Sequence, residues 1–435
     1  MPGELDKMRL NDPQGQGPDN APQAQSTSGY ISRITCRLCE SDQLEDVIHF
    51  PDTPVGDEYV REPRSQRTFP LNLAVCQRCG HLMIREVVDP ELLYGNFSYL
   101  TRVSLGLTEH FRDYAYDVAR KTELANDAFV LDIGSNDGTL LRFFMEQGMR
   151  VLGVDPAEEA VRIANQEGVE SLPIYFNDTS ARELKDKYGQ ADLIVSNNTF
   201  ANIDDLTGFF EAVRIMMAPG GTFVFETGYA VDLARFIIFD NIYHEHLSYF
   251  LVAPLEQFFR RIGMHLYNVE RIDTKGGSIR GYVRVAQGDP CITESVRSLL
   301  ELENEYKSAD LEVFKLVNDR IDSARQATHE LLDGLKTEGK IIAGYGASVG
   351  VTTMIYHMGL AGYLEYVVDD NEIKHGLYSP GEHIPVYSSE EIYARNPDYI
   401  VILAWRYADP IVSRHQEFLE RGGHFIVPIP APQIV

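Results

Sequence analysis

Short apolar runs alternate with longer amphipathic runs in the middle of the chain. The run 128–133 (AFVLDI) has no polar alternation, 139–148 (TLLRFFMEQG) is amphipathic, and 151–154 (VLGV) is apolar again. Buried parallel strands are apolar on both faces, and the helices that connect them are amphipathic. The pattern therefore predicts a strand, helix, strand unit that starts near residue 128.

The same alternation continues to residue 286 and predicts a doubly wound α/β domain. Strands are expected at 171–176, 191–198 and 221–227, and a helix at 204–221. A helix and two further strands, 264–272 and 279–286, follow. A second unit of this kind starts at 340 with strand, glycine loop and helix, and has later strands at 363–371, 399–405 and 424–430.

The remaining segments differ in composition. Residues 1–30 are rich in Pro, Gly, Gln, Asn and Ser, which predicts a disordered tail, and 293–338 is charged and helical, which predicts a connector. The expected division is 1–30 tail, 31–85 cysteine-bearing domain, 86–125 linker helices, 126–290 first α/β domain, 291–338 helical connector and 339–435 second Rossmann-like domain.

Charge and composition exclude several classes of protein. The 435 residues carry a net charge of −26, which argues against nucleic acid as a partner. No window of 18 consecutive apolar residues is present, so no membrane span is expected, and the first thirty residues contain no apolar signal region. Cytoplasmic localisation, as a monomer or homodimer, is the expectation.

Four of the five cysteines form two C-x-x-C pairs. Each pair, Cys36 with Cys39 and Cys76 with Cys79, can place two thiolates on one tight turn, and two such turns complete a tetrahedral site for a structural Zn²⁺. Two separate redox pairs are the weaker alternative, because a redox C-x-x-C needs a βαβ setting. His49 and His81 lie nearby and are expected at the surface or behind the ligands.

The loop after the first strand has the pattern D-x-G-x-x-x-G, and an acid ends the second strand. Glycines let the backbone approach a ligand, and an acid in that place can bind ribose hydroxyls. The short acidic loop suits S-adenosylmethionine, which has no pyrophosphate. The residues expected to bind this cofactor are Asp132, Gly134, Ser135, Asn136, Asp137, Gly138, Asp155, Asn177 and Asn198.

The stretch NIYHEHLSYF, 241–250, is dense in titratable groups. An acid/base site, a metal site and a strand with a polar face are all compatible with it, although its histidines lack the H-E-x-x-H spacing. The glycine loop 344–348 also leaves two interpretations: a phosphate or nucleotide site at a helix N-terminus, or a Rossmann-like domain that only packs.

Over residues 34–435 the chain resembles the sugar C-methyltransferases of the TylC3 type. The resemblance rests on the order of two C-x-x-C pairs, D-x-G-S-N-D-G, I-Y-x-E-H, K-G-G-x-I-R, G-Y-G-A, H-I-P-V and A-W. It implies a class I S-adenosylmethionine methyltransferase sheet between a zinc-binding domain and a C-terminal Rossmann-like domain. It also implies methylation at C3 of a nucleotide-linked 4-keto-6-deoxysugar.

The resemblance further implies roles for individual residues. His246 would be the base that removes the proton beside the ketone, Glu245 would orient its imidazole, and Tyr243 and Tyr99 would complete the catalytic group. The residues implied to hold the nucleotide sugar are Lys275, Gly276, Arg280, Tyr345, Gly346 and Ala347.

Two positions depart from the family pattern. Asn202 stands where some members carry a histidine, so an accessory base is absent and the role is concentrated on His246. Gly350 stands where some members carry a lysine, so the nucleotide stays open between dTDP, GDP, CDP and UDP. An O- or N-methyltransferase on the same scaffold, and a non-catalytic protein that binds zinc and a ligand, are the alternatives.

Overall fold

The computed structural model describes residues 25–27, 29–94, 100–103, 106–286, 292–306 and 310–435. Residues 1–24 of the expected tail lie outside this part, and β1 (Gln25–Thr27) and β2 (Tyr30–Ser32) fall at its end. No helix in the described ranges is long and apolar enough to cross a membrane.

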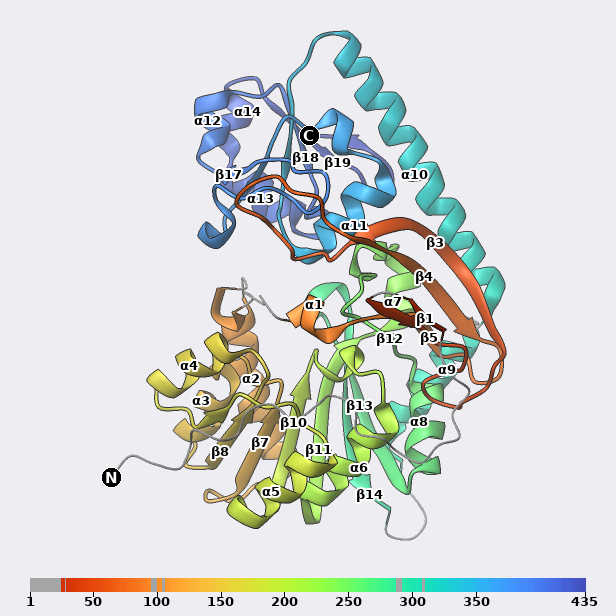
Figure 1. Ribbon diagram of the computed structural model, residues 1–435, viewed down its shortest axis with the longest axis vertical. Coiled ribbons are helices and arrows are strands. Elements are labelled where there is room, and N and C mark those ends of the chain that lie inside the picture. The colour runs from red at the N-terminus through yellow and green to blue at the C-terminus, as the bar shows by residue number, and fades with distance from the viewer. Residues whose placement is uncertain (1–24, 28, 95–99, 104–105, 287–291, 307–309) are drawn as a thin grey trace.

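The middle domain is built on a seven-stranded sheet in the order β13-β14-β11-β10-β7-β8-β9 (Figure 1). β14 is antiparallel to both of its neighbours. The chain winds outward from β7 in both directions, so a crevice for a ligand is expected where β7 and β10 end. The strands are β7 (Phe129–Ile133), β8 (Arg150–Val154), β9 (Ser171–Leu172), β10 (Ala191–Asn197), β11 (Met217–Gly228), β13 (Met264–Ile272) and β14 (Ser278–Val285).

Helices cover both faces of this sheet, because neighbouring strand residues point to opposite sides. Val130 packs with α2 and α3 on one face, and Leu131 belongs to the larger core on the other. The helix expected over 204–221 ends earlier, and β11 begins at once. The covering helices are α2 (Leu107–Lys121), α3 (Thr139–Glu146), α4 (Glu158–Gln166), α5 (Asp178–Tyr188), α6 (Leu206–Met216) and α8 (Val252–Arg261), whereas α7 (Ala230–Phe236) follows β11 and contacts α10.

The N-terminal domain shares a sheet with the middle domain. β3 (Leu44–Pro54), β4 (Thr68–Cys76) and β5 (Leu82–Ile84) pair in sequence, and β12 (Ser248–Tyr249) joins them beside β5. β12 belongs to the stretch NIYHEHLSYF, which the sequence analysis assigned to the middle domain alone. β6 (Glu86–Val88) lies outside this four-stranded sheet and pairs with β2, and α1 (Pro90–Tyr94) follows it.

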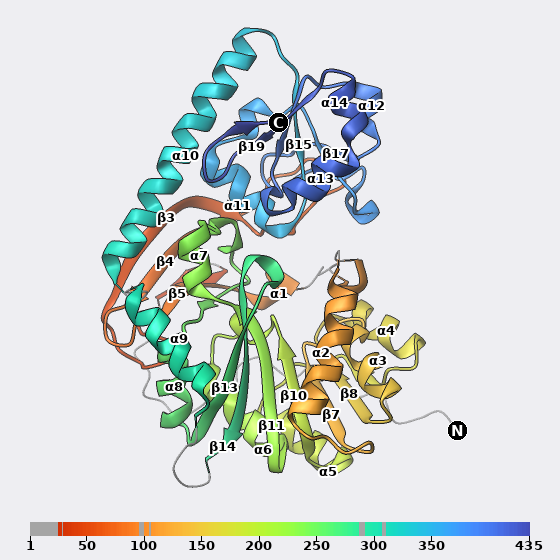
Figure 2. The same ribbon diagram turned by 180° about the vertical axis from the view of Figure 1, so that it is seen from behind.

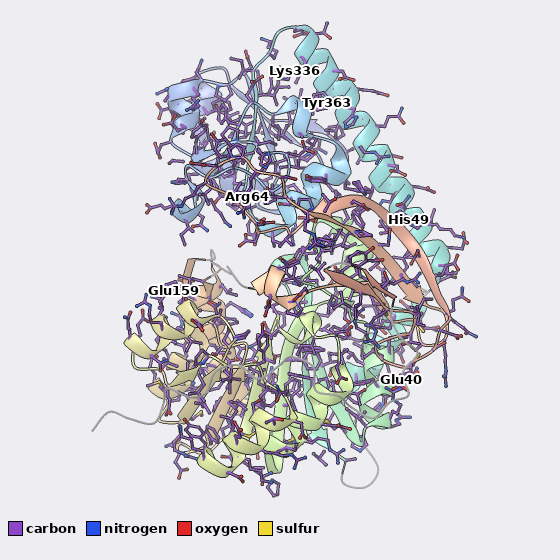
Figure 3. All side chains as sticks on the ribbon, in the orientation of Figure 1. Glu40, His49, Arg64, Glu159, Lys336 and Tyr363 are labelled. Atoms are coloured by element: carbon purple, nitrogen blue, oxygen red, sulfur yellow. The ribbon has the colours of Figure 1, made fainter. Side chains whose placement is uncertain are left out.

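A helical connector leads to the C-terminal domain. α9 (Glu294–Glu305) is followed by α10 (Leu311–Thr337), which runs along the outside of the molecule beside β3 (Figure 2). Lys336 and Tyr363 mark where the last turns of α10 meet the C-terminal domain (Figure 3). That domain has the sheet order β17-β16-β15-β18-β19-β20. Its elements are β15 (Ile342–Tyr345), α11 (Val349–Met358), β16 (Val367–Asp369), β17 (Val386–Ser388), α12 (Glu391–Arg395), β18 (Tyr399–Ile402), α13 (Ala408–Arg414), α14 (Gln416–Glu420), β19 (His424–Val427) and β20 (Gln433–Ile434).

Helix α11 packs against both other domains. Thr352 donates a hydrogen bond to the carbonyl of Gly56 in the N-terminal domain, and Thr353 donates one to the carbonyl of Ile242, each at 2.8 Å. Gly350 allows this approach: a Cβ atom there would lie 2.4 Å from the carbonyl oxygen of Asp240. The lysine of some family members would therefore require a different helix position.

Replacing Gly350 with alanine should destabilise the protein, because the added methyl group meets a backbone atom that cannot rotate away. The expected loss in the free energy of unfolding is about 1–3 kcal/mol, the usual cost of overpacking. Thermal or urea unfolding would measure it. Gly362→Ala is the matched control, since a Cβ there has no neighbour within 4 Å. An equal effect of the two substitutions would contradict this account.

Candidate active site

The loop Gly134–Gly138 lies between β7 and α3, at the switch point of the sheet. Three of its residues have positive φ angles: Gly134 at 82°, Asn136 at 49° and Gly138 at 73°. Most of its N–H groups are already bonded: Gly134 donates to Val154, Asn136 to the Asp155 carboxylate, and Gly138 to Ser135. A loop that binds pyrophosphate leaves such groups free. The loop therefore fits a nucleoside cofactor without a pyrophosphate.

Two acids stand at the ends of β7 and β8, as the cofactor prediction requires. The Asp155 carboxylate is fixed by the N–H groups of Asn136 and Ala157, at 2.9 and 2.8 Å. Burial, reinforced by the charge of Asp155, raises the pKa of Asp132 to about 8. Both residues are at most 8% exposed, so they can present polar groups to a ligand in a dry site.

The other predicted cofactor residues have mixed surroundings. The Ser135 hydroxyl is buried without a partner among the described residues, whereas Asp137 is bonded to Thr139 and to Arg102 at 2.9 Å. Asn177 caps α5 through Ser180. Thr101, in the linker, donates to the Asn136 side chain, so the linker contacts the loop. Tyr99 lies outside the described residues.

A cavity follows the ends of β10 and β11, and it contains the catalytic candidates Tyr243 and His246. Its lining is Asn198, Ala201, Thr227, Gly228, Tyr229, Ala230, Leu233, Ile238, Asn241, Tyr243, His246, Ser248, Tyr249, Lys275 and Gly277. Asn198, which directly follows β10 and is a predicted cofactor residue, also lines this cavity. The base candidate and the cofactor crevice therefore adjoin.

His246 is held in one tautomer. Its Nδ1 lies 3.2 Å from the carbonyl oxygen of Asn241, and its Nε2 lies 2.8 Å from the Tyr243 hydroxyl. A carbonyl can only accept, so Nδ1 carries the proton and Nε2 accepts from Tyr243. Desolvation, with the positive charges of Lys275 and Arg406, lowers the pKa of His246 to about 3. The imidazole is neutral at neutral pH and can accept a proton at Nε2.

Glu245 does not orient this imidazole, contrary to the expectation from the resemblance. The two partners of the His246 ring are Asn241 and Tyr243. Glu245 is 4% exposed, and its Oε2 is buried without a hydrogen-bond partner among the described residues. Burial raises its pKa to about 7. These residues lie in a turn, where neighbouring side chains point in different directions, and the spacing of the residues in the sequence does not show this.

The turn at 274–277 brings a lysine to the cavity. Lys275 and Gly276 have φ angles of 53° and 87°, and Lys275 lines the cavity wall. Its ammonium forms no ion pair with any residue that the structure describes. The Lys275 side chain is exposed, yet desolvation by the surrounding protein and the charge of Arg406 lower its pKa to about 8. An unpaired cation at this cavity suits an anionic ligand.

Arg280, a predicted substrate residue, serves the fold instead. Its side chain is 5% exposed, lies over the ring of Tyr114 and pairs with Glu226 and Asp117. Glu226 also bonds His110 at 2.7 Å. The side chain points from β14 toward α2, so no donor remains directed at the cavity.

Part of the C-terminal glycine loop is bonded within its own domain. The Tyr345 hydroxyl donates to Asp370 at 3.0 Å, the Ala347 N–H donates to Asp369 at 2.6 Å, and Gly346 packs against Ala404. None of Tyr345, Gly346 and Ala347 lines the catalytic cavity. Arg406, in the loop after β18, does reach its rim, where it bonds Asn241 and Lys275. Sequence reasoning missed it, although it directly follows the A-W motif.

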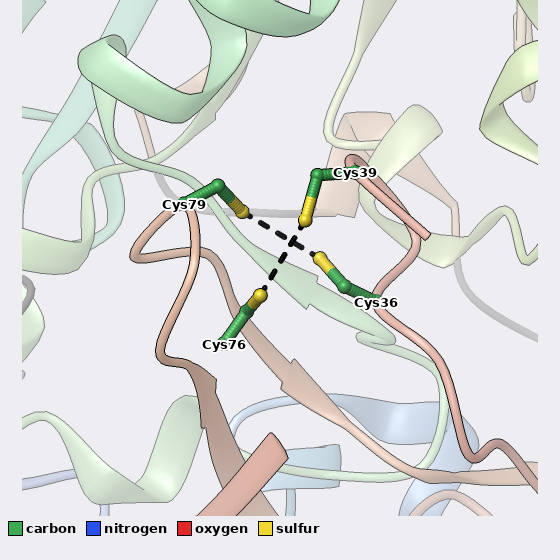
Figure 4. A group of neighbouring side chains, drawn as sticks. All are labelled: Cys36, Cys39, Cys76 and Cys79. Carbon is green, nitrogen blue, oxygen red and sulfur yellow. Dashed lines mark hydrogen bonds between the residues drawn. The ribbon is translucent and has the colours of Figure 1, made fainter. Parts of the chain in front are cut away.

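The four paired cysteines converge as predicted (Figure 4). Their sulfurs lie within 4.8 Å of one another, with 3.7 Å between Cys36 and Cys79 and 3.5 Å between Cys39 and Cys76. Thiolates around a tetrahedral zinc, at about 2.3 Å from it, lie about 3.8 Å apart. The donor set therefore fits a closed S₄ zinc site.

This cysteine cluster is joined to the catalytic stretch. Arg37, between the first two cysteines, donates to the carbonyls of Ile84 and Leu247, at 2.5 and 3.0 Å. His81 Nε2 lies 3.2 Å from the Ser248 hydroxyl. His81 is thus buried behind the cysteines, whereas His49 is exposed on β3 (Figure 3).

Comparisons with known proteins agree with this architecture. Three family models match: "Putative zinc binding domain" over 36–94, "Methyltransferase domain" over 108–269 and "C-methyltransferase C-terminal domain" over 273–430. The C-methyltransferase NovU of Streptomyces niveus is 34% identical over 92% of this chain and 96% of its own length.

Other similarities are partial. The ubiquinone biosynthesis O-methyltransferase of Bordetella avium is 29% identical over 22% of this chain and 42% of its own length. The PH0226 protein of Pyrococcus horikoshii is 16% identical, covers 44% of this chain and 98% of its own, and superimposes with a TM-score of 0.36.

The described sheet order, the loop that fits a nucleoside cofactor and the full-length similarity to NovU lead to one assignment. The chain belongs to the C-methyltransferase family and is an S-adenosylmethionine-dependent enzyme with a class I methyltransferase fold.

Proposed function

We propose that this C-methyltransferase acts on a nucleotide-linked 4-keto-6-deoxysugar, with His246 removing the proton from the carbon beside the ketone. The observation that carries the proposal is the neutral His246 imidazole, whose accepting Nε2 faces Tyr243 in a cavity that adjoins the cofactor loop. A carbon acid beside a ketone needs such a base before it can attack a methyl donor.

Each residue has a definite part in the proton transfer. The Asn241 carbonyl holds the Nδ1 proton of His246, so the imidazolium that forms keeps a hydrogen bond. When Nε2 takes the substrate proton, the Tyr243 hydroxyl loses its acceptor and can donate to the enolate oxygen instead. S-Adenosylmethionine, when bound, supplies the methyl group on a cationic sulfonium. The apolar wall of the cavity, with Ile238 and Leu233, excludes water.

The positive charges at the cavity support a nucleoside diphosphate as the carrier of the sugar. Lys275 has no ion-pair partner among the described residues, and Arg406 extends from the switch point of the C-terminal sheet, between β15 and β18. Ligands of doubly wound sheets bind at such points. A nucleotide at that crevice would place its phosphates beside Lys275 and its sugar beside His246.

Replacing His246 with alanine should abolish carbon methylation and proton exchange at the carbon beside the ketone. Loss of a general base costs roughly 10²–10⁴-fold in rate. Mass spectrometry would follow deuterium uptake and methyl gain by a panel of dTDP, GDP, CDP and UDP 4-keto-6-deoxysugars. His49→Ala, on the exposed face of β3, is the control. Methylation of oxygen or nitrogen without exchange would overturn the proposal.

The acid limb of kcat/KM should lie well below pH 6.5, because protonation inactivates His246 and its pKa is lowered to about 3. Lys275→Met removes a positive charge, so the pKa of His246 should rise and the limb should move to higher pH. The acid limb of kcat should lie at a higher pH than the acid limb of kcat/KM. The reason is that the phosphates of bound substrate offset the charges of Lys275 and Arg406, which raises the pKa of His246. Exchange rates between about pH 3 and pH 9 would test both shifts. A limb that Lys275→Met leaves unmoved would contradict the assignment.

We also propose that the four cysteines hold one structural zinc ion. Purified protein should contain about one zinc per chain, and Cys76→Ser should lose it and unfold at a lower temperature. Elemental analysis and thermal unfolding would measure this. Cys291→Ser, a change outside the paired cysteines, should keep the metal. Iron in the purified protein, or a zinc content that Cys76→Ser does not alter, would contradict the site.

A further inference from the structure

Arg406 belongs to the C-terminal domain, but all of its described hydrogen bonds go to the methyltransferase domain. Its guanidinium donates to the Lys275 carbonyl at 2.7 Å, to the Asp240 carboxylate at 3.2 Å and to the Asn241 side-chain oxygen at 3.1 Å. Its side chain is 21% exposed, and Asp240 is 6% exposed. The fork of donors is therefore largely occupied by protein acceptors.

Asn241 connects Arg406 to His246. The same residue that binds Arg406 through its side chain binds His246 Nδ1 through its main-chain carbonyl, which also accepts from the Tyr249 hydroxyl at 3.2 Å. Arg406 thus lies two hydrogen bonds away from the imidazole, with Asn241 between them.

The backbone before Asn241 needs external support. Ile237 has a φ angle of 56°, in the left-handed region that β-branched residues avoid. Such strain persists only where surrounding contacts hold the chain. Asn241 ends the short turn η3 (Phe239–Asn241) that follows, and Arg406 bonds two residues of it. Without Arg406 this turn would lose the hydrogen bonds that join Asp240 and Asn241 to the loop after β18.

We propose that Arg406 is a positioning residue: through Asn241 it fixes the tautomer and orientation of His246, so that the base is complete only when the C-terminal domain is docked. This inference rests on the proposed role of His246. It predicts that removing Arg406 lowers kcat far more than it raises KM, because the imidazole and not the substrate loses a contact.

The test compares Arg406→Ala, Arg406→Lys, Asn241→Ala and the double variant Arg406→Ala/Asn241→Ala. Arg406→Ala should lower kcat for exchange by roughly 10- to 100-fold, the cost of a small misplacement. Arg406→Lys should recover part of it. The kcat of the double variant should be little lower than that of either single variant, because both substitutions interrupt the same chain of hydrogen bonds from Arg406 through Asn241 to His246. Arg421→Ala, which removes an exposed pair with Glu417, is the control.

Nitrogen-15 spectra of the histidine rings give a readout that needs no substrate. The His246 signal, assigned with His246→Ala, should show the Nδ1–H tautomer in the wild type and a tautomer mixture in Arg406→Ala. If Arg406→Ala changes the tautomer but the wild-type protein shows no exchange activity, the positioning role stands and the proposed reaction is rejected. An unchanged tautomer, or a rise in KM with kcat intact, would overturn the inference and make Arg406 a substrate contact.

Discussion

The structure depends on how the segment 239–249 is held, because this segment has little regular structure of its own. The other two domains supply its contacts: β5 of the N-terminal domain pairs with β12, while Thr353 of α11 and Arg406, both in the C-terminal domain, bond the Ile242 carbonyl and Asp240. A buried backbone must satisfy its polar groups, and here partners distant in sequence do so. The position of His246, the proposed base, is thus a property of the assembled molecule.

This arrangement connects the cysteine cluster to the stretch that carries His246. Arg37 on the first cysteine turn bonds the Leu247 carbonyl, and His81 after the second turn meets Ser248. Zinc in a closed S₄ site would have no open position for chemistry, but it would fix the turns that bear these two residues. His246, the proposed base, is therefore supported from the N-terminal side by the two cysteine-bearing turns and from the C-terminal side by Arg406.

Charge placement explains why an acidic protein keeps cations at its cavity. The net charge is −26, and Arg280 is paired within the fold, yet Lys275 is unpaired among the described residues. Burial is the main cause of the lowered pKa of His246, and the charges of Lys275 and Arg406 disfavour the protonated imidazole further. A bound anion would weaken that effect and make the base stronger when substrate is present.

The sequence by itself determined the features that local chemistry encodes. Apolar runs predicted the strands of both α/β domains, paired cysteines predicted the cluster, and the loop Gly134–Gly138 with Asp155 predicted the cofactor crevice. These signals depend on residues close in the chain. Only the tertiary structure decided that β12 joins the N-terminal sheet, that Arg280 is buried and that Arg406 reaches the cavity. Those outcomes follow from which surfaces pack together across more than a hundred residues, and no local pattern encodes that choice.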